Sequence, residues 1–203
     1  MDQLVDMDSV LISGPAFSGR RQLFHQILGM WGANALIIST RKTADHVQLT
    51  HRQRCTTTDE SPELLIVDTL SNALDRPTTD TSQTKYAQHP SNLVSIGTKF
   101  TSILGQHENK DLSVGITTID PLLVYASASD VFDFLTIIIQ KSTVADFPVV
   151  ATVDPDAHDE TTIAQLVSLF DAVVETRRTT DERQEYRIQH PHSTKWCPVT
   201  QCS

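Results

Sequence analysis

Two glycines with four residues between them stand near the start of the chain, where an apolar strand is expected to lead into a helix. Residues 9–24 read as a short apolar strand, a turn of small residues and then a helix. This spacing is typical of a phosphate-binding loop, in which backbone N–H groups and the helix N-terminus stabilise an anion. The predicted phosphate- or nucleotide-binding residues are Gly14, Pro15, Ala16, Phe17, Ser18, Gly19, Arg20 and Arg21.

The two residues after the second glycine decide which chemistry the loop could support. In active loops of this kind they are a lysine that contacts the outer phosphates and a serine or threonine whose hydroxyl binds magnesium. Here they are Arg20 and Arg21. A guanidinium pairs well with an oxyanion, but it cannot bind magnesium. We therefore hypothesise weak binding of ATP, ADP or a phosphate anion that does not need magnesium; the alternative is a tight turn that binds nothing.

Two further positions, each after an expected strand, lack the carboxylate that nucleotide hydrolysis needs. Arg41 and Lys42 follow the strand at 35–38, where a carboxylate would orient the attacking water. Thr117 ends the strand at 114–118, which we expect beside the strand of the loop, and stands where an aspartate would hold the magnesium shell. The sequence therefore predicts no catalytic residue and no competent ATP hydrolysis.

Two aspartates that follow apolar strands could be mistaken for that missing carboxylate. Asp68 ends the strand at 64–68, which by chain order is the wrong strand, so we interpret it as a helix cap or turn residue. Asp120 lies three residues after Thr117 and could approach the site. The interpretation that we favour is that Asp120 caps the helix after Pro121.

Acidic residues and a histidine are dense between 154 and 160. They could bind a metal ion, but their spacing matches no known ligand pattern. They also stand at the entry to an expected helix, where the helix dipole favours carboxylates. We therefore interpret them as structural and expect no metal site. The residues concerned are Asp154, Asp156, His158, Asp159 and Glu160.

Two features near the end of the chain could serve contacts with another protein chain. Arg177 and Arg178, at the end of an expected strand, could contact a nucleotide bound to a neighbouring subunit, or they could be a solvated pair. Trp196 is a large apolar side chain in the expected tail and could serve a contact with a partner protein.

The composition excludes several functional classes. The 203 residues include 16 basic and 25 acidic side chains, a formal net charge of −9, which argues against general nucleic-acid binding. We find no apolar run long enough for a membrane span and no signal-peptide pattern. The scattered cysteines Cys55, Cys197 and Cys202 are typical of idle thiols in a reducing cytoplasm, where we expect the protein to work. The acidic excess suits either a salt-rich cytoplasm or an ordinary acidic protein.

Strands and helices alternate along the chain in five units. Strands are expected to begin near Val10, Ala35, Leu64, Val114 and Pro148, each followed by a helix. This alternation predicts an α/β fold with a mostly parallel central sheet flanked by helices on both faces. Two further segments, at 172–176 and 185–189, are expected to form an antiparallel pair of strands at one edge.

The domain organisation follows from the same pattern. We expect one α/β domain over residues 1–190, with a mobile polar excursion at about 75–90. Ser91 is expected to cap the helix that ends near residue 106. Residues 121–123 are expected to lead into a helix at 129–140, and residues 191–203 to form a flexible tail.

Longer motifs carry a resemblance to a known group of proteins. The segments are Gly14–Gly19, His89–Gly97, Val114–Tyr125 with Val131–Leu135, and Val153–Thr162 with Leu169–Glu175. Together they cover most of the chain. On these segments the chain resembles the RecA superfamily, in the KaiC-like and GvpD-like branch of archaeal proteins, and is most similar to truncated members from salt-loving archaea.

The resemblance implies a RecA-like P-loop fold and a regulatory role. Active relatives have an aspartate where this chain has Thr117. We therefore expect a catalytically degenerate domain that acts as a regulatory or scaffold protein with protein partners, and that could form a homo-oligomer. The alternatives are a nucleotide-binding switch or slow ATPase that uses Arg20 in place of lysine and, with less support from the charge, a DNA-associated recombinase-like accessory protein.

Overall fold

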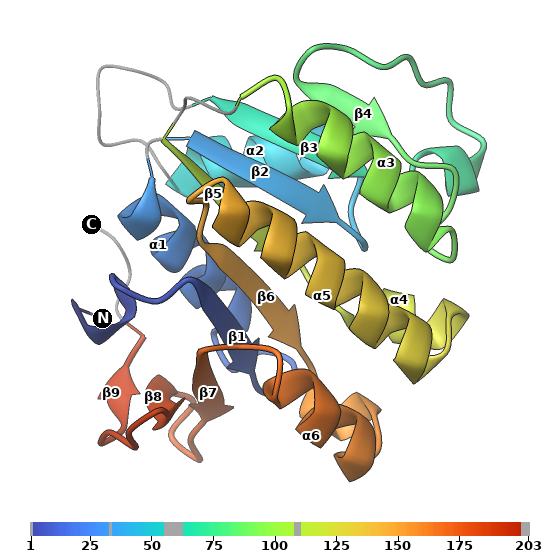
Figure 1. Cartoon of the computed structure of the whole chain (residues 1–203). Helices are drawn as coiled ribbons and strands as arrows, with labels where there is room; N and C mark the ends of the chain where they lie inside the picture. Colours follow the sequence, from blue (N-terminus) through green and yellow to red (C-terminus); the bar gives the residue numbers. More distant parts are fainter. Residues whose placement is uncertain (1, 33, 55–62, 108–110, 200–203) are drawn as a thin grey trace.

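Nine strands form one central sheet with helices on both of its faces (Figure 1). The computed structural model describes residues 2–32, 34–54, 63–107 and 111–199. The order of strands across the sheet is β4-β3-β2-β5-β6-β1-β7-β8-β9. The strands are β1 (Ser9–Ser13), β2 (Asn34–Ser39), β3 (Leu64–Asp68), β4 (Thr84–Tyr86), β5 (Leu112–Ile116), β6 (Val149–Val153), β7 (Ala172–Arg178), β8 (Gln184–His190) and β9 (Cys197–Pro198).

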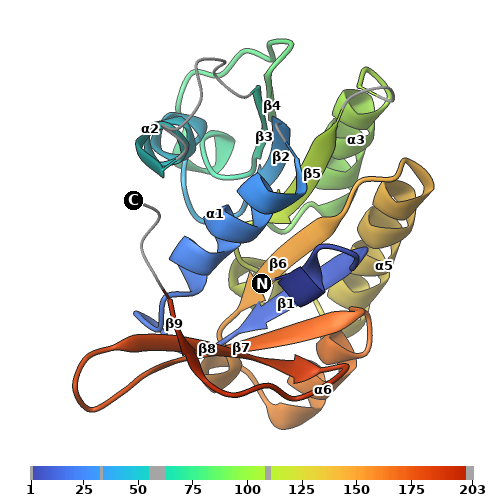
Figure 2. The same cartoon turned by 90° about the vertical axis from the view of Figure 1, so that its left-hand side faces the viewer.

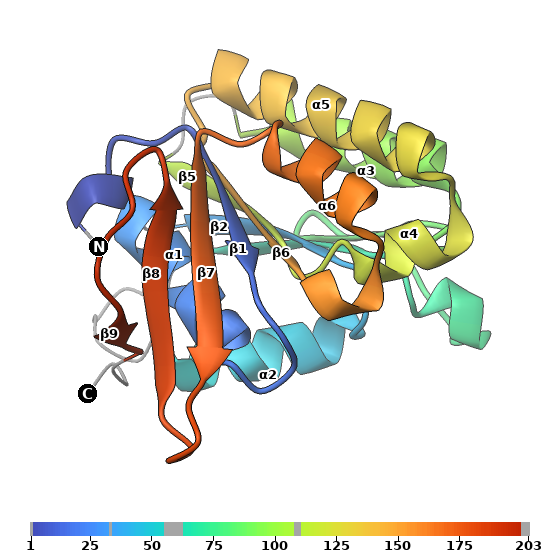
Figure 3. The same ribbon diagram turned by 90° about the horizontal axis from the view of Figure 1, so that it is seen from below.

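The helices divide between the two faces of the sheet. Helices α1 and α2 cover one face, and α3, α4, α5 and α6 lie on the other (Figure 3). The α-helices are α1 (Arg20–Trp31), α2 (Ala44–Arg54), α3 (Leu93–Leu104), α4 (Asp120–Tyr125), α5 (Ala128–Val144) and α6 (Glu160–Val167), and three short 3-10 helices lie at Asp2–Leu4, Asn72–Leu74 and Pro155–Ala157.

The central strands are apolar along their whole length because helices cover both of their sides. Alternate residues of β1 show this: Leu11 joins the core under α3 and α5, whereas Val10 and Ile12 join the core under α1. At Gly115 on β5 a side chain would collide with the ring of Phe24 on α1, so glycine there lets the helix lie close to the sheet.

The predicted parallel sheet is confirmed, and so is the antiparallel pair at its edge. Strands β1, β2, β3, β5 and β6 run parallel in one sheet, and β7 pairs with β8 in the antiparallel sense. One detail of the order was wrong. Strand β6 lies between β1 and β5, so the strand that ends before Thr117 is not beside the strand of the loop.

The polar excursion contains more regular structure than its sequence indicates. Residues Thr84–Tyr86 form β4, which pairs with β3 at one edge of the sheet, and a 3-10 turn at Asn72–Leu74 lies just before the excursion. The predicted cap of α3 was wrong by one residue, because the side chain of Asn92, rather than that of Ser91, accepts the N–H of Ser95 at 2.9 Å.

The segment after β5 forms two helices instead of one. The predicted lead-in at 121–123 is part of a separate short helix, α4, which ends at Tyr125. Ser127 then caps α5 by accepting the N–H of Asp130 at 3.1 Å. Within the described residues, none of the helices combines the length and apolar character that a membrane span needs.

The C-terminal segment, expected to be flexible from residue 191, instead folds back along the sheet. Strand β9 pairs with β8, so Cys197 and Pro198 add one short strand to the sheet beyond its last long strand (Figure 2). Trp196 lies against the guanidinium groups of Arg177 and Arg187, at 4.0 and 4.7 Å from its ring centroid. Residues 200–203 of the expected tail lie outside the described residues.

Candidate functional site

The carboxyl ends of the parallel strands meet along one edge of the sheet, and the predicted loop is part of that edge. Register pairs Ser13 at the end of β1 with Val153 at the end of β6 and with Glu175 on β7. The ends of β2 and β5 lie beside them, because Ile38 pairs with Ile116. In open α/β sheets a ligand lies at this edge, so it is the place to examine for a site.

The loop at 14–19 packs tightly against β7 and β8. A side chain at Gly14 would collide with the hydroxyl and carbonyl of Thr176, so the glycine is needed for the approach of β7. The hydroxyls of Ser18 and Thr176 are 2.6 Å apart. From β8, the side-chain amide of Gln184 donates to the carbonyl of Phe17 at 2.8 Å. These contacts hold the loop from the side of the antiparallel strands.

The loop turns into α1 through two residues with left-handed backbone. Phe17 has φ 65° with its side chain 80% exposed, and Gly19 has φ 97°. Gly19 is also the N-cap of α1, without a capping side chain, so the first N–H groups of the helix lack that common partner. This arrangement is compatible with a weak anion site at the start of α1.

Arg20, which stands where active loops have lysine, is held by two aspartates. One guanidinium nitrogen, Nη2, donates to Asp154 Oδ2 at 3.2 Å. The other, Nη1, lies 3.8 Å from Asp120 Oδ2 and is buried without a hydrogen-bond partner among the described residues. The side chain is only 13% exposed. The positive charge at the start of α1 is therefore balanced from within the protein.

Asp120 connects four elements rather than capping α4, so the interpretation that we favoured was wrong. Its carboxylate accepts from the hydroxyl of Thr118 at 2.6 Å and from the N–H of Asp154 at 2.9 Å. His158 Nε2 lies 3.2 Å from Asp120 Oδ1, the oxygen that also accepts the N–H of Asp154. The N-cap of α4 is Ile119, which gives no side-chain cap. We call Arg20, Asp120, Asp154 and His158 the arginine cluster.

Thr117, where active relatives have an aspartate, holds neighbouring strand ends together. Its hydroxyl accepts from the N–H of Thr40 at 3.2 Å, and its carbonyl accepts from the hydroxyl of Thr152 at 2.7 Å. The hydroxyl of Thr40 donates to the carbonyl of Thr118 at 2.6 Å. These neutral groups tie the ends of β2, β5 and β6, and Thr117 itself offers a metal no carboxylate.

Arg41 and Lys42 lie just beyond β2 with exposed side chains. In the described part of the chain neither has an ion pair, and the carbonyl of Lys42 accepts from the hydroxyl of Ser39 at 2.6 Å.

Asp68, at the end of β3, is fully buried and accepts the N–H of Ala44, the first residue of α2, at 2.7 Å. Asp68 also accepts two N–H groups and a hydroxyl from its own turn, so its predicted role as a cap or turn residue is confirmed.

The acidic segment before α6 divides into caps and site residues. Asp159 caps α6 by accepting both the N–H and the hydroxyl of Thr162, and this hydrogen bonding lowers the pKa of its carboxyl. Asp154 caps the 3-10 turn at Pro155–Ala157 and also binds Arg20. No group of three or more histidine, cysteine, aspartate or glutamate side chains is arranged to hold a metal ion within the described residues.

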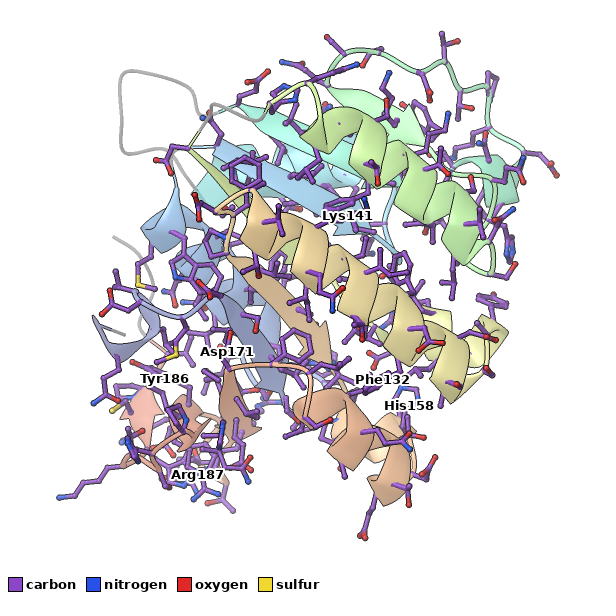
Figure 4. All side chains as sticks on the ribbon, viewed as in Figure 1. Phe132, Lys141, His158, Asp171, Tyr186 and Arg187 are labelled. Atoms are coloured by element: carbon purple, nitrogen blue, oxygen red, sulfur yellow. The ribbon has the colours of Figure 1, made fainter. Side chains whose placement is uncertain are left out.

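Arg177 and Arg178 are paired within the chain. Arg177 donates twice to Glu185, at 2.9 and 2.7 Å, and Arg178 lies 2.9 Å from Glu182. Arg177 also covers one side of Trp196, so the indole that we expected to meet a partner is packed against this chain's own strands. Figure 4 shows the neighbouring Arg187 in the same C-terminal region.

Comparison with known proteins assigns the chain to a family. A model of a family of unknown function, DUF7504, matches residues 8–176. The chain belongs to this family. Comparison with curated proteins finds no match. The family assignment covers the loop and every residue of the arginine cluster, and it names no activity.

Two solved structures are similar to this DUF7504 member. An uncharacterised protein of Pyrococcus horikoshii, PH0321, in complex with an unknown peptide, is 11% identical, with 93% of this chain and 88% of that chain covered and a TM-score of 0.61. The flagellar accessory protein FlaH of Methanocaldococcus jannaschii is 12% identical, with 89% and 76% covered and a TM-score of 0.49. The Pyrococcus structure supports the α/β fold described above.

The donor set does not fit a magnesium-nucleotide complex. Arg20 is engaged with two carboxylates, Arg21 has no hydroxyl for a metal, and Thr117 has no carboxylate. The carboxylates of Asp120 and Asp154 already accept hydrogen bonds from protein groups. We therefore derive no catalytic step through magnesium or ATP.

The site residues that are far along the chain from their partners were not identified from the sequence. Thr176 and Gln184 fix the loop, and His158 contacts Asp120, but each is more than 30 residues away in sequence from its partner. Asp154 was noted only within a dense acidic segment. Two features of the sequence could have indicated its role. Asp154 is a carboxylate one residue beyond the strand that neighbours β1, and Arg20 is an arginine at the start of α1 that needs such a partner.

Proposed function

We propose that this DUF7504 protein is a catalytically degenerate RecA-like domain that acts as a regulatory or scaffold protein rather than as an ATPase. The observation that carries the proposal is the pairing of Arg20 with Asp154 and Asp120. An outer phosphate of a nucleotide would have to displace those carboxylates from the guanidinium. Together with the threonine at position 117, this pairing removes the electrostatic stabilisation on which phosphoryl transfer depends.

The proposal also includes the domain bounds, the anion site and the branch of proteins that the sequence predicts. We assign residues 1–190 to one domain, residues 14–21 to a weak anion site, and the chain to the KaiC-like and GvpD-like branch in a salt-rich cytoplasm. Scaffold function requires a protein partner. The similar Pyrococcus protein was solved in complex with an unknown peptide, so binding of a protein segment is compatible with this fold.

A phosphate-release assay tests the proposal. Purified protein with ATP and magnesium should release phosphate no faster than an Arg20→Ala variant, because the arginine contributes nothing to turnover. An Arg20→Lys variant controls for the loss of the positive charge. A clear rate in the native chain that disappears in Arg20→Ala would overturn the proposal.

A nucleotide-binding switch is the second candidate, and the geometry of the loop favours it. The left-handed Gly19, the start of α1 without a side-chain cap and the exposed Arg21 are compatible with binding of a phosphate tail. Titration with ATP and ADP, with and without magnesium, separates the two candidates. Tight binding that requires magnesium supports the switch, whereas weak binding that ignores magnesium supports the degenerate scaffold.

A further inference from the structure

Helices α3 and α5 lie side by side on one face of the sheet (Figure 1). Residues of both helices line a groove of about 980 Å³. Its lining repeats at helical spacing on both walls. On α3 the wall consists of Val94, Gly97, Thr98, Thr101 and Ser102; on α5 it consists of Asp130, Asp133, Phe134, Ile137, Ile138 and Lys141. This groove lies on the face of the sheet opposite α1, away from the helix that bears Arg20.

The groove is apolar and open, although its walls belong to two packed helices. Phe134 and Ile138 form a buried floor, while Ile137 is 50% exposed and Val94 is 79% exposed. The α3 wall is low because its residues are small: a side-chain carbon at Gly97 would meet only the ring of Phe134, at 3.9 Å. The space above this wall could admit another helix, because packed helices approach to about 8–10 Å between axes.

Two of the charged side chains on the α5 wall, Asp133 and Lys141, would each face the opposite charge if a second α5 lay against this one in the antiparallel direction. Asp133 and Lys141 are each four residues from Ile137, one on either side, so the three side chains form one ridge. The two charges are about 12 Å apart along the helix. Both side chains are exposed, and in the described part of the chain neither has an ion-pair or hydrogen-bond partner. Figure 4 labels Lys141 on α5.

We propose that this face binds a second copy of the same chain through a two-fold interface centred on Ile137. An antiparallel α5 from the second copy would place its lysine at position 141 beside Asp133 and its own aspartate at position 133 beside Lys141. Such reciprocity is what a two-fold interface requires. Each α5 would then lie in the groove of the other copy, and the exposed Ile137 side chains would be covered.

A differently charged partner fits the pattern less well. A basic partner would satisfy Asp133 but would meet Lys141, and an acidic partner would do the reverse. A second copy satisfies both ends at once. The formal net charge of −9 opposes association of two copies at low ionic strength, so the dimer is expected to form most readily when salt screens the long-range repulsion.

Analytical ultracentrifugation at about 0.5 M salt, where long-range repulsion is largely screened, tests the interface. The native chain should dimerise, and Ile137→Asp should weaken the dimer at least about tenfold because the change occurs twice at the centre of the interface. Leu49→Asp on α2 is the matched control, because Leu49 is 57% exposed on the other face of the sheet. This control should dimerise like the native chain.

Exchange of the charges at positions 133 and 141 tests the interface more specifically than Ile137→Asp does. Asp133→Lys and Lys141→Asp should each weaken the dimer, because each brings like charges together twice, and the double variant should restore it. A native chain that stays monomeric at about 100 µM, roughly a hundred times a micromolar Kd, would overturn the proposal. So would a dimer that is indifferent to Ile137→Asp, or single charge variants that the double variant does not rescue. None of these readouts involves the phosphate loop, so failure here is distinct from failure of the proposed function.

Discussion

Arg20 shows how one side chain can change what a phosphate-binding loop is able to do. Its guanidinium reaches over the end of β6 to Asp154 and toward Asp120, and Asp120 is held in turn by Thr118 and His158. Partly buried charge pairs of this kind are costly to break from one side, since removal of one partner leaves the other unpaired. The cluster therefore fixes the start of α1 and reduces the affinity of the loop for an outside anion.

Parts of this site could be predicted from residues alone, and parts could not. The substitutions at Arg20, Arg21 and Thr117 are visible because each falls at a fixed place after a glycine or an apolar strand. The roles of Asp120 and His158 were not visible, because their partners come from other elements. Local sequence favours a capping role for an aspartate before proline, and the tertiary contacts override that preference.

Asp68 should be the carboxylate whose loss destabilises the fold most clearly. It is fully buried and accepts four hydrogen bonds. Asp68→Asn replaces one acceptor oxygen with a donor, so we expect the free energy of unfolding to fall by about 2 kcal/mol or more. Urea denaturation measures this. Asp75→Asn, at an exposed residue with left-handed backbone, is the control and should change stability little.

His51 predicts a dependence of stability on pH. Burial lowers the pKa of its imidazole below the ordinary value of 6.5. Below about pH 6.5 the unfolded chain therefore binds a proton that the folded chain resists, so the free energy of unfolding falls as the pH drops. Denaturation between pH 7.5 and 5.5 should show this fall, and His51→Gln should make it shallower. An equal fall in both proteins would contradict the assignment.

At the scale of elements, strongly patterned segments were predictable and short ones were not. The five parallel strands that were predicted, β1, β2, β3, β5 and β6, are apolar runs, and their nature follows from burial on both sides. Strand β4 has three residues and β9 has two, so neither shows a periodic pattern. They form because they pair with strands at the edges of the sheet, and the local sequence does not show that such an edge is nearby.

Trp196 is expected to hold the C-terminal segment against β8. The centroid of its ring lies 4.0 and 4.7 Å from the guanidinium groups of Arg177 and Arg187, and each such contact contributes about 0.5–1 kcal/mol when exposed. Trp196→Ala should therefore release residues 194–199 with little effect on the central sheet. Hydrogen exchange would then rise at Val199, whose N–H bonds Gln184, and stay unchanged in β1. Equal protection at Val199 in both proteins would count against this role.

At the scale of the whole molecule, the two faces of the sheet support different functions. The face with α1 and the adjoining edge contain the loop and the arginine cluster, and the face with α3 and α5 contains the apolar groove. The positive charge at the start of α1 is balanced internally, which agrees with the proposed regulatory or scaffold role. The α/β arrangement follows from the alternation of strands and helices, and the function proposed here rests on side chains at the edge of the sheet.

Calorimetric titration with ATP, with and without magnesium, tests the central claim most directly. The native chain should bind weakly and without regard to magnesium, because Asp154 and Asp120 compete for Arg20. Asp154→Asn keeps the shape and the capping oxygen but removes one competing charge, so its affinity for ATP should rise about tenfold, which corresponds to about 1.4 kcal/mol. Tight, magnesium-dependent binding by the native chain that is lost in Arg20→Ala would contradict the account.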